Sequence, residues 1–466
     1  MKGKIREYGR LFGQALRGDP NINYTEGSIR RVTFLLAIPM ILEMAMESVF
    51  ALVDIFFVAR LGPEAVATVG LTEAVISLLF AIAIGLSMAT TAMVARRIGE
   101  GKPLAAAAVA AQALWIGVFT SVLVGIVGWF YADRILLLMG AEEAVIEAGT
   151  TYTQIMLGGS FTILFLFLNN AIFRGAGDAS IAMKSLVLAN GINIVLDPLL
   201  IFGWGPFPEL GVTGAAVATN IGRGVGVAYQ LYHLCLGSRR IRLHLREMGL
   251  QLKLALQLLR ISVGGIAQFL IATASWIFLM RLVAQYGSEA IAGYTIAIRV
   301  IIFIMLPSWG LSNAVATLVG QNLGARKPER AQATVYQVAK YNVFYMGSMA
   351  LILILFPSWI MGFFSAEPGV VDSGILALRI LSYGFIFLAV GIVALQAFNG
   401  AGDTMTPTWI NALCFWLLQI PLAWTLATYL GMGPHGVYWA IFVADMSFSI
   451  MATLVFLRGR WKLKSV

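Results

Sequence analysis

Charged residues are scarce in this chain of 466 residues: 12% are Asp, Glu, Lys or Arg, while 59% are hydrophobic. Soluble globular proteins carry about 25% charged residues, so this chain lacks the side chains for a water-facing surface. The mean hydropathy of +0.84 agrees. The apolar runs are long and unbroken rather than alternating, which favours helices over a β-barrel. The composition therefore predicts a multi-span α-helical membrane protein.

Other features are absent as well. The two cysteines, Cys235 and Cys414, lie in or beside apolar runs, which excludes a disulfide framework. No Gly-rich loop ends in Gly-Lys-Ser or Gly-Lys-Thr, which excludes an ATP motor within the chain. The first apolar run, near Val32, is too long for a cleavable signal. A membrane-embedded enzyme would need clustered His or Asp motifs at helix ends, and none is present. We therefore expect neither an enzyme nor a resident cofactor.

At about 20 apolar residues per crossing, the sequence predicts twelve membrane-spanning helices. We expect them at 32–58, 65–94, 104–131, 148–172, 180–203, 211–236, 257–283, 290–318, 332–357, 373–397, 405–430 and 436–457. Lys and Arg gather in the N-terminal arm, the C-terminal tail and alternate connecting segments. The net charge of +9 then indicates basic cytoplasmic segments rather than binding of a nucleic acid. The expected location is the inner (plasma) membrane, with both termini cytoplasmic.

An internal repeat at an offset of 225 residues organises the chain. GPEAVA at 62–67 returns as GSEAIA at 287–292, AMVARRIG at 92–99 as TLVGQNLG at 317–324, and FRGAGD at 173–178 as FNGAGD at 398–403. Six helices separate the copies, so both halves have the same orientation and a pseudo-two-fold axis along the membrane normal. The fold class is therefore all-α, with two six-helix lobes.

The repeat also divides the chain into segments. We expect an N-terminal arm at 1–31, a first lobe at 32–236, a linker at 237–256, a second lobe at 257–457 and a tail at 458–466. Two facing lobes indicate alternating access, in which a cavity between them opens to one side and then to the other. A channel would need a filter sequence, and none is visible.

Acidic residues within the predicted spans are the first candidates for function, because charge inside a bilayer is costly. These residues are Glu43, Glu47, Asp54, Asp197 and Asp445. Glu43, Glu47, Phe50 and Asp54 share one helical face, and Asn193 and Asp197 are one turn apart. We expect Asp54 and Asp197 to meet in the outer half of the first lobe, where such a pair holds a proton or Na⁺. The repeat partners of Glu43, Asp54 and Asp197 are Gln268, Leu279 and Leu422, so one lobe is specialised for cations.

Four motifs carry a resemblance to a known family. They are SVFALVD at 48–54, VARLG at 58–62, RGAGD at 174–178 and NIVLDP at 193–198. Over residues 26–457 the chain resembles the multidrug and toxic compound extrusion (MATE) transporters, in particular their prokaryotic DinF-like branch. The resemblance implies an antiporter of two six-helix lobes, driven by H⁺ or Na⁺, that exports small amphipathic, often cationic compounds. We expect a monomer.

The resemblance also assigns site residues. It places Asp54, Asn193 and Asp197 in one cation-coupling cluster, and matches Asn170 and Thr219 to polar residues of the fourth and sixth helices. Phe50 stands where many relatives carry Tyr, and Glu47 stands where Gln is usual. We expect Glu47 to join the cluster in handling protons; the alternative is a hydrogen bond to a neighbouring helix. No metal is expected beyond Na⁺ at Asp54 and Asp197.

A substrate cavity between the lobes is expected as well. Its predicted lining residues are Phe50, Glu43, Gln268, Arg299 and Asp445. Arg299 either pairs with Asp445, which we favour, or meets an anionic substrate. The alternative function within the superfamily is a flippase for a lipid or lipid-linked precursor. Flippases of this topology tend to carry several basic cavity residues, whereas Arg223 and Arg299 are the only candidates here, against at least four acids.

Overall fold

The computed structural model describes residues 2–237, 240–244 and 248–464, without the side chains of residues 2–5, 7, 8, 50 and 51. Its first half contains α1 (Lys2–Arg17), α2 (Ile29–Val58), α3 (Pro63–Gly99), α4 (Pro103–Leu138), α5 (Glu143–Gly158), α6 (Ser160–Ala176), α7 (Ala179–Ile201) and α8 (Val212–Cys235). Its second half contains α9 (Leu252–Ala284), α10 (Ser288–Gly324), α11 (Pro328–Leu355), α12 (Pro357–Phe364), α13 (Pro368–Ser382), α14 (Phe385–Gly400), α15 (Met405–Asn411), α16 (Ile420–Trp424) and α17 (Pro434–Leu457). Two π-helical segments, Ala412–Gln419 and Thr425–Tyr429, join α15 and α16 into one span.

Among the described residues, nine helical segments are long and apolar enough to cross a membrane, and α13 with α14, bent by 55°, makes a tenth. The two remaining crossings are α2 and α8. Helix α2 is 30 residues long and carries three carboxylates in an otherwise apolar sequence, and α8 combines apolar residues with several glycines. The count of twelve crossings in two lobes of six is thus confirmed.

The helices of the two lobes follow the same register. Helices α3 and α10 begin 225 residues apart, at Pro63 and Ser288, and so do α4 and α11, at Pro103 and Pro328. The residue before each of α3 and α10 is a glycine, Gly62 or Gly287, with φ of 107° and 108°. A side chain disfavours that backbone conformation, so glycine at both places preserves the same turn.

Three helix boundaries illustrate where the structure differs from the sequence expectation. Helix α9 begins at Leu252, inside the segment 237–256 assigned to the linker, so the connection between the lobes is shorter than predicted. Helices α3 and α10 extend to Gly99 and Gly324, past the ends of their apolar runs. Hydropathy detects the part of a helix that suits a bilayer and misses polar turns that project beyond it.

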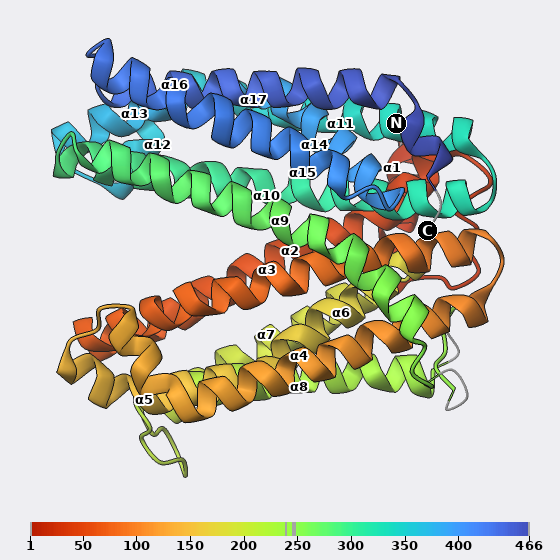
Figure 1. Cartoon of the computed structure of the whole chain (residues 1–466), viewed down its shortest axis with the longest axis horizontal. Helices are drawn as coiled ribbons and strands as arrows, with labels where there is room; N and C mark the ends of the chain where they lie inside the picture. The colour runs from red at the N-terminus through yellow and green to blue at the C-terminus, as the bar shows by residue number, and fades with distance from the viewer. Residues whose placement is uncertain (1, 238–239, 245–247, 465–466) are drawn as a thin grey trace.

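The lobes converge at the end of the molecule where both termini lie and diverge at the opposite end (Figure 1). We call these ends the terminal side and the open side. Glycines mark the convergence: a Cβ at Gly265 of α9 would lie 2.8 Å from Gly85 Cα of α3, and one at Gly310 of α10 would lie 2.6 Å from Ile41 Cα of α2. Close contacts between the lobes therefore occupy the halves of these four helices nearest the terminal side.

Toward the open side, the same faces of these helices are exposed. Two or three turns from the contacts lie Leu52 of α2, Leu78 of α3, Trp276 of α9 and Phe303 of α10, which are 59%, 58%, 41% and 64% exposed. Separations of seven and eleven residues return to nearly the same face of a helix. These four side chains therefore point toward the opposite lobe, and we call the space that they border the inter-lobe cleft.

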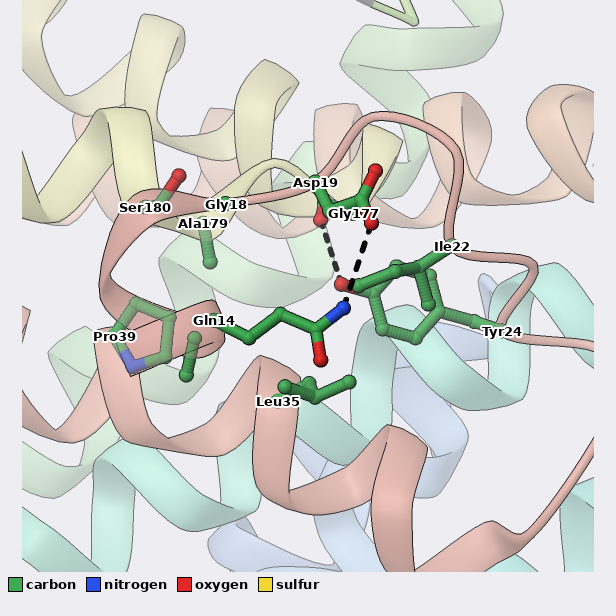
Figure 2. A pocket seen from close by; sticks show the side chains of 11 residues that line it. Gln14, Gly18, Asp19, Ile22, Tyr24, Leu35, Pro39, Gly177, Ala179 and Ser180 are labelled. Atoms are coloured by element: carbon green, nitrogen blue, oxygen red, sulfur yellow. Dashed lines mark hydrogen bonds between the residues drawn. The ribbon is translucent and has the colours of Figure 1, made fainter. Parts of the chain in front are cut away.

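The segment between α1 and α2 ties the lobes together on the terminal side. Figure 2 shows a small pocket there, with the Tyr24 hydroxyl directed at Gly177 between α6 and α7; it donates a hydrogen bond to the Gly177 carbonyl at 3.0 Å. From the second lobe, Lys327 donates to the Thr25 carbonyl at 3.1 Å and Arg330 donates to the Gly27 carbonyl at 2.9 Å. Burial raises the pKa of Tyr24 to about 12, so its hydroxyl stays a donor at neutral pH.

Candidate functional site

Three helices of the first lobe bring Asp54, Asn193, Asp197 and Thr219 together, and we call these residues the carboxylate cluster. Asn193 Nδ2 donates to Asp197 Oδ1 at 3.1 Å and to Thr219 Oγ1 at 3.4 Å. Thr219 Oγ1 lies 3.5 Å from Asp54 Oδ1, at the limit of a hydrogen bond. A chain of side-chain contacts therefore links the carboxylate of α2 to that of α7 through α8.

Local sequence explains why these helices approach so closely. A Cβ at Gly222 of α8 would lie 2.8 Å from the Ala189 carbonyl of α7, so glycine permits this packing next to Thr219. Pro198, directly after Asp197, cannot donate a backbone hydrogen bond to the preceding turn. The cluster is consequently dry: Asp197 and Asn193 are 0% exposed and Asp54 is 7% exposed.

Two oxygens of the carboxylate cluster receive no hydrogen bond from any residue that the structure describes. They are Asp197 Oδ2 and Asn193 Oδ1, both buried. A buried acceptor without a donor is costly, and a carboxylate without a partner more so. A proton on the carboxylate or a bound cation removes this cost, and carboxylate, amide and hydroxyl oxygens are ligands that hard cations prefer. The donor set therefore suits H⁺ or Na⁺.

Glu47 has basic neighbours that the sequence interpretation overlooked. It interacts electrostatically with Arg223 of α8 and with Arg174 of α6. Arg223 lies one turn from Thr219 toward the terminal side, and it also interacts with Asp54. Charges of opposite sign thus alternate along the inside of the first lobe. The sequence predicts that Glu47 handles protons together with other acids, and this prediction leaves out the guanidinium groups of Arg223 and Arg174.

Two residues expected in functional roles have structural partners instead. Glu43, predicted to line the cavity, is 1% exposed and forms an ion pair with Arg174, at 3.0 Å between Oε1 and Nη1. Asn170, predicted to join the carboxylate cluster, accepts a hydrogen bond from Gln230 Nε2 at 2.5 Å. Gln230 lies eleven residues from Thr219 on α8, about 16 Å along the helix, so Asn170 lies well away from the cluster.

The remaining predicted cavity residues do not form one surface. Gln268, 4% exposed, donates to Asn399 Oδ1 at 3.2 Å and to the Thr404 carbonyl at 2.9 Å inside the second lobe. Asp445 of α17 lies at the bend between α13 and α14, where a Cβ at Gly384 would be 3.6 Å from its Oδ2. Arg299 is exposed, and among the described residues it forms no ion pair with Asp445, so the favoured pairing is wrong. The side chain of Phe50 lies outside the described residues.

The sequence interpretation missed Arg174 and undervalued Arg223. Arg174 was assigned only to the basic terminal side, although it belongs to the quoted RGAGD motif. The repeat carried the missing signal: the partners of Glu43 and Arg174 at the 225-residue offset are Gln268 and Asn399, which also contact each other. When two polar residues of one lobe are both replaced by other polar residues at the matched positions of the other lobe, the two positions are expected to be in contact.

Comparisons with known proteins agree with this architecture. The MatE family model matches residues 39–199 and again residues 265–425, once in each lobe, as the internal repeat predicts. A probable multidrug resistance protein NorM of Thermotoga maritima is 29% identical over 442 residues, covering 94% of each chain. A MOP superfamily transporter from Pyrococcus furiosus superimposes with a TM-score of 0.86 at 28% identity, covering 97% of this chain and 98% of that one. An outward-facing multidrug resistance MATE family transporter superimposes with a TM-score of 0.85 at 28% identity, covering 96% of each. The chain therefore belongs to the MatE family of multidrug efflux transporters, and it is a membrane transporter rather than an enzyme.

Proposed function

We propose that this protein is a secondary active antiporter that exports small amphipathic, often cationic compounds in exchange for H⁺, with Na⁺ as the alternative ion. The observation that supports this most is the buried carboxylate cluster, in which Asp54 and Asp197 interact electrostatically. Two carboxylates near each other in a dry environment favour taking up one positive charge. Asp54 and Asp197 are the proposed cation-coupling residues, and no other cofactor is required.

Helix α2 connects the proposed cation site to the contact between the two lobes. Near its open-side end it carries Asp54, and near its terminal-side end Ile41 packs against Gly310 of the second lobe. Pro39 lies inside α2 beside this contact and weakens the helix there. Neutralising Asp54 changes the balance of charge along α2, and movement of α2 in turn affects the contact that holds the terminal side closed. This is the proposed link between cation uptake and alternating access.

The proposed orientation follows from charge. Lys and Arg of the terminal side, including Arg240, Lys327 and Arg330, support a cytoplasmic location for this side. The inter-lobe cleft then opens outward, which is the state in which a substrate leaves and a coupling ion enters. The proposed location is the inner membrane, and the proposed functional unit is the monomer.

Purified protein in proteoliposomes tests this proposal. A cationic dye is trapped with the protein, and export is followed while a pH gradient or a Na⁺ gradient is imposed alone. We expect the pH gradient to drive export and the Na⁺ gradient at constant pH to have little effect. Export driven only by Na⁺ would replace the coupling ion, and failure of both gradients to drive any cationic dye would refute the antiport function.

A further inference from the structure

Arg299 points from the second lobe toward the first. It lies eleven residues into α10 from the open side, about 16 Å along the helix. Phe303, Leu306 and Gly310 follow it at spacings of four, seven and eleven residues, so all four share one face of α10. Gly310 on this face packs against Ile41 of α2. Three turns further toward the open side, where the lobes have separated, the same face carries Arg299.

The surroundings of Arg299 are apolar and open. Its side chain is exposed, and it makes no ion pair or side-chain hydrogen bond with any residue that the structure describes. The inter-lobe cleft that its helix face borders is lined by Phe303, Leu52, Leu78 and Trp276, all more than a third exposed. A guanidinium group within a membrane-spanning segment is tolerated where it faces water or a charged partner. The inter-lobe cleft gives the guanidinium group of Arg299 access to water.

The carboxylates of the first lobe do not serve as that partner. Ile41 and Leu52 face the second lobe, whereas Glu43, Glu47 and Asp54 lie on the opposite face of α2, since the two sets differ by about half a turn. Glu43 is already paired with Arg174. The acidic interior of the first lobe and the guanidinium of the cleft are therefore separate features on opposite sides of one helix.

We propose that Arg299 is a specificity-determining residue that binds the carboxylate of an amphiphilic substrate in the inter-lobe cleft. A guanidinium group binds a carboxylate through two parallel hydrogen bonds, and the aromatic and aliphatic side chains beside it suit the apolar body of such a compound. The substrates then include zwitterions and acids, beyond the cationic compounds expected for this transporter. This inference rests on the export function proposed above, but binding tests it separately.

A matched pair of dyes isolates the carboxylate. Rhodamine B carries one, and its ethyl ester is the same fluorophore without it. Fluorescence polarisation with detergent-purified protein gives the dissociation constant of each dye. We expect Arg299→Gln to weaken binding of the acid about tenfold or more, as for loss of a charge-assisted hydrogen bond, and to change binding of the ester less than about twofold. An equal effect on both dyes, or none on either, would overturn the proposal.

The second lobe provides a control at the same depth. Arg379 lies eleven residues into α13 and is exposed, but α13 packs against α10, α11, α12 and α17 rather than the first lobe. Arg379→Gln is expected to leave the preference for the acid unchanged, and a loss equal to that of Arg299→Gln would overturn the proposal.

A second variant tests the proposal if Arg299→Gln does not fold. Phe303→Glu places a carboxylate one turn away on the same face and is expected to abolish the preference for the acid. A preference that survives in Phe303→Glu refutes the assignment. Wild-type protein that binds the acid through Arg299 but exports neither dye would instead refute the antiport function alone.

Discussion

The two lobes share one backbone design but differ in charge at matched positions. In the first lobe, Arg174 and Glu43 form a buried ion pair at 3.0 Å. At the repeat-equivalent positions of the second lobe, Gln268 and Asn399 form a neutral amide contact at 3.2 Å. Both contacts join the first span of a lobe to its fourth. Both lobes therefore share the position of this contact, and only the first lobe makes it with charged groups.

The difference extends toward the open side. Asp54 and Asp197 of the first lobe correspond to Leu279 and Leu422 of the second, and Leu279 is buried. A leucine cannot change its charge, whereas a carboxylate exchanges a proton or binds a cation. The comparison teaches that at these matched positions only the first lobe carries groups that can change their charge, and in the proposed mechanism these groups act as its switch.

The largest expected effect comes from removing that switch. Asp197→Asn keeps the shape and hydrogen bonding of the side chain but cannot exchange a proton, so gradient-driven dye export should fall to the level of empty liposomes. Insertion and folding should persist, as judged by size-exclusion elution. The matched control is Asp445→Asn, which gives the second lobe the residue that the first lobe has there, Asn220. It should retain most export. Wild-type rates in Asp197→Asn would make Asp197 a structural residue.

The next effect concerns stability and follows from the ion pair. Arg174→Gln leaves Glu43, 1% exposed, without its cation, which should lower the free energy of unfolding by about 3–5 kcal/mol. Thermal unfolding of purified protein measures the loss. The double variant Glu43→Gln with Arg174→Asn transfers the amide contact of the second lobe into the first and should recover most of it. A double variant as unstable as Arg174→Gln would show that packing, not charge, distinguishes the two contacts.

Much of this contrast was predictable from the sequence. The repeat fixes which residues correspond, and helical spacing places Asp54 and Asp197 at similar depth on two helices. The structure brings these residues together through Asn193 and Thr219, as the resemblance implied. Such inference succeeds because a membrane span has one dominant periodicity and because polar residues in apolar segments are rare enough to stand out.

The partners of the polar residues were harder to predict. The sequence predicts Glu43 at the cavity and Arg299 in an ion pair with Asp445, whereas Glu43 pairs with Arg174 and Arg299 forms no ion pair with any described residue. Periodicity gives the face of a helix but not the neighbour that the face meets, since this depends on how the helices pack. The convergence of the lobes at Gly85 and Gly310 decides which faces are closed and which border the cleft. The periodicity of a single sequence does not specify that choice.

A smaller effect is expected at Glu47, which tests whether the switch of the first lobe extends beyond the carboxylate cluster. Glu47→Gln restores the residue common among relatives and removes one acid between Arg223 and Arg174. If Glu47 exchanges protons during transport, the pH dependence of export should change while the maximal rate stays close to that of wild type. An unchanged pH profile would remove Glu47 from the mechanism.

The smallest effect concerns the segment that joins the lobes on the terminal side, where the two anchors differ in burial. Tyr24, 4% exposed, holds the segment to the first lobe through the Gly177 carbonyl at 3.0 Å. Lys327 holds it to the second lobe from a side chain that is 42% exposed. Tyr24→Phe should lower the free energy of unfolding by about 1 kcal/mol, the usual worth of a neutral hydrogen bond. Lys327→Gln should cost less, because water competes for the exposed anchor.

The pH dependence of the Tyr24 contact separates it from the charged contacts. Burial raises the pKa of Tyr24 to about 12 in the folded protein, above the value of about 10 for an exposed tyrosine. A raised pKa means that the stabilisation is complete below about pH 10 and is lost as the pH rises from about 10 to 12. The difference in unfolding free energy between wild type and Tyr24→Phe should therefore be equal at about pH 6 and about pH 8. A difference that changes over this range would contradict the assignment to the Tyr24 hydroxyl, and a larger loss for Lys327→Gln than for Tyr24→Phe would show that the second-lobe anchor dominates.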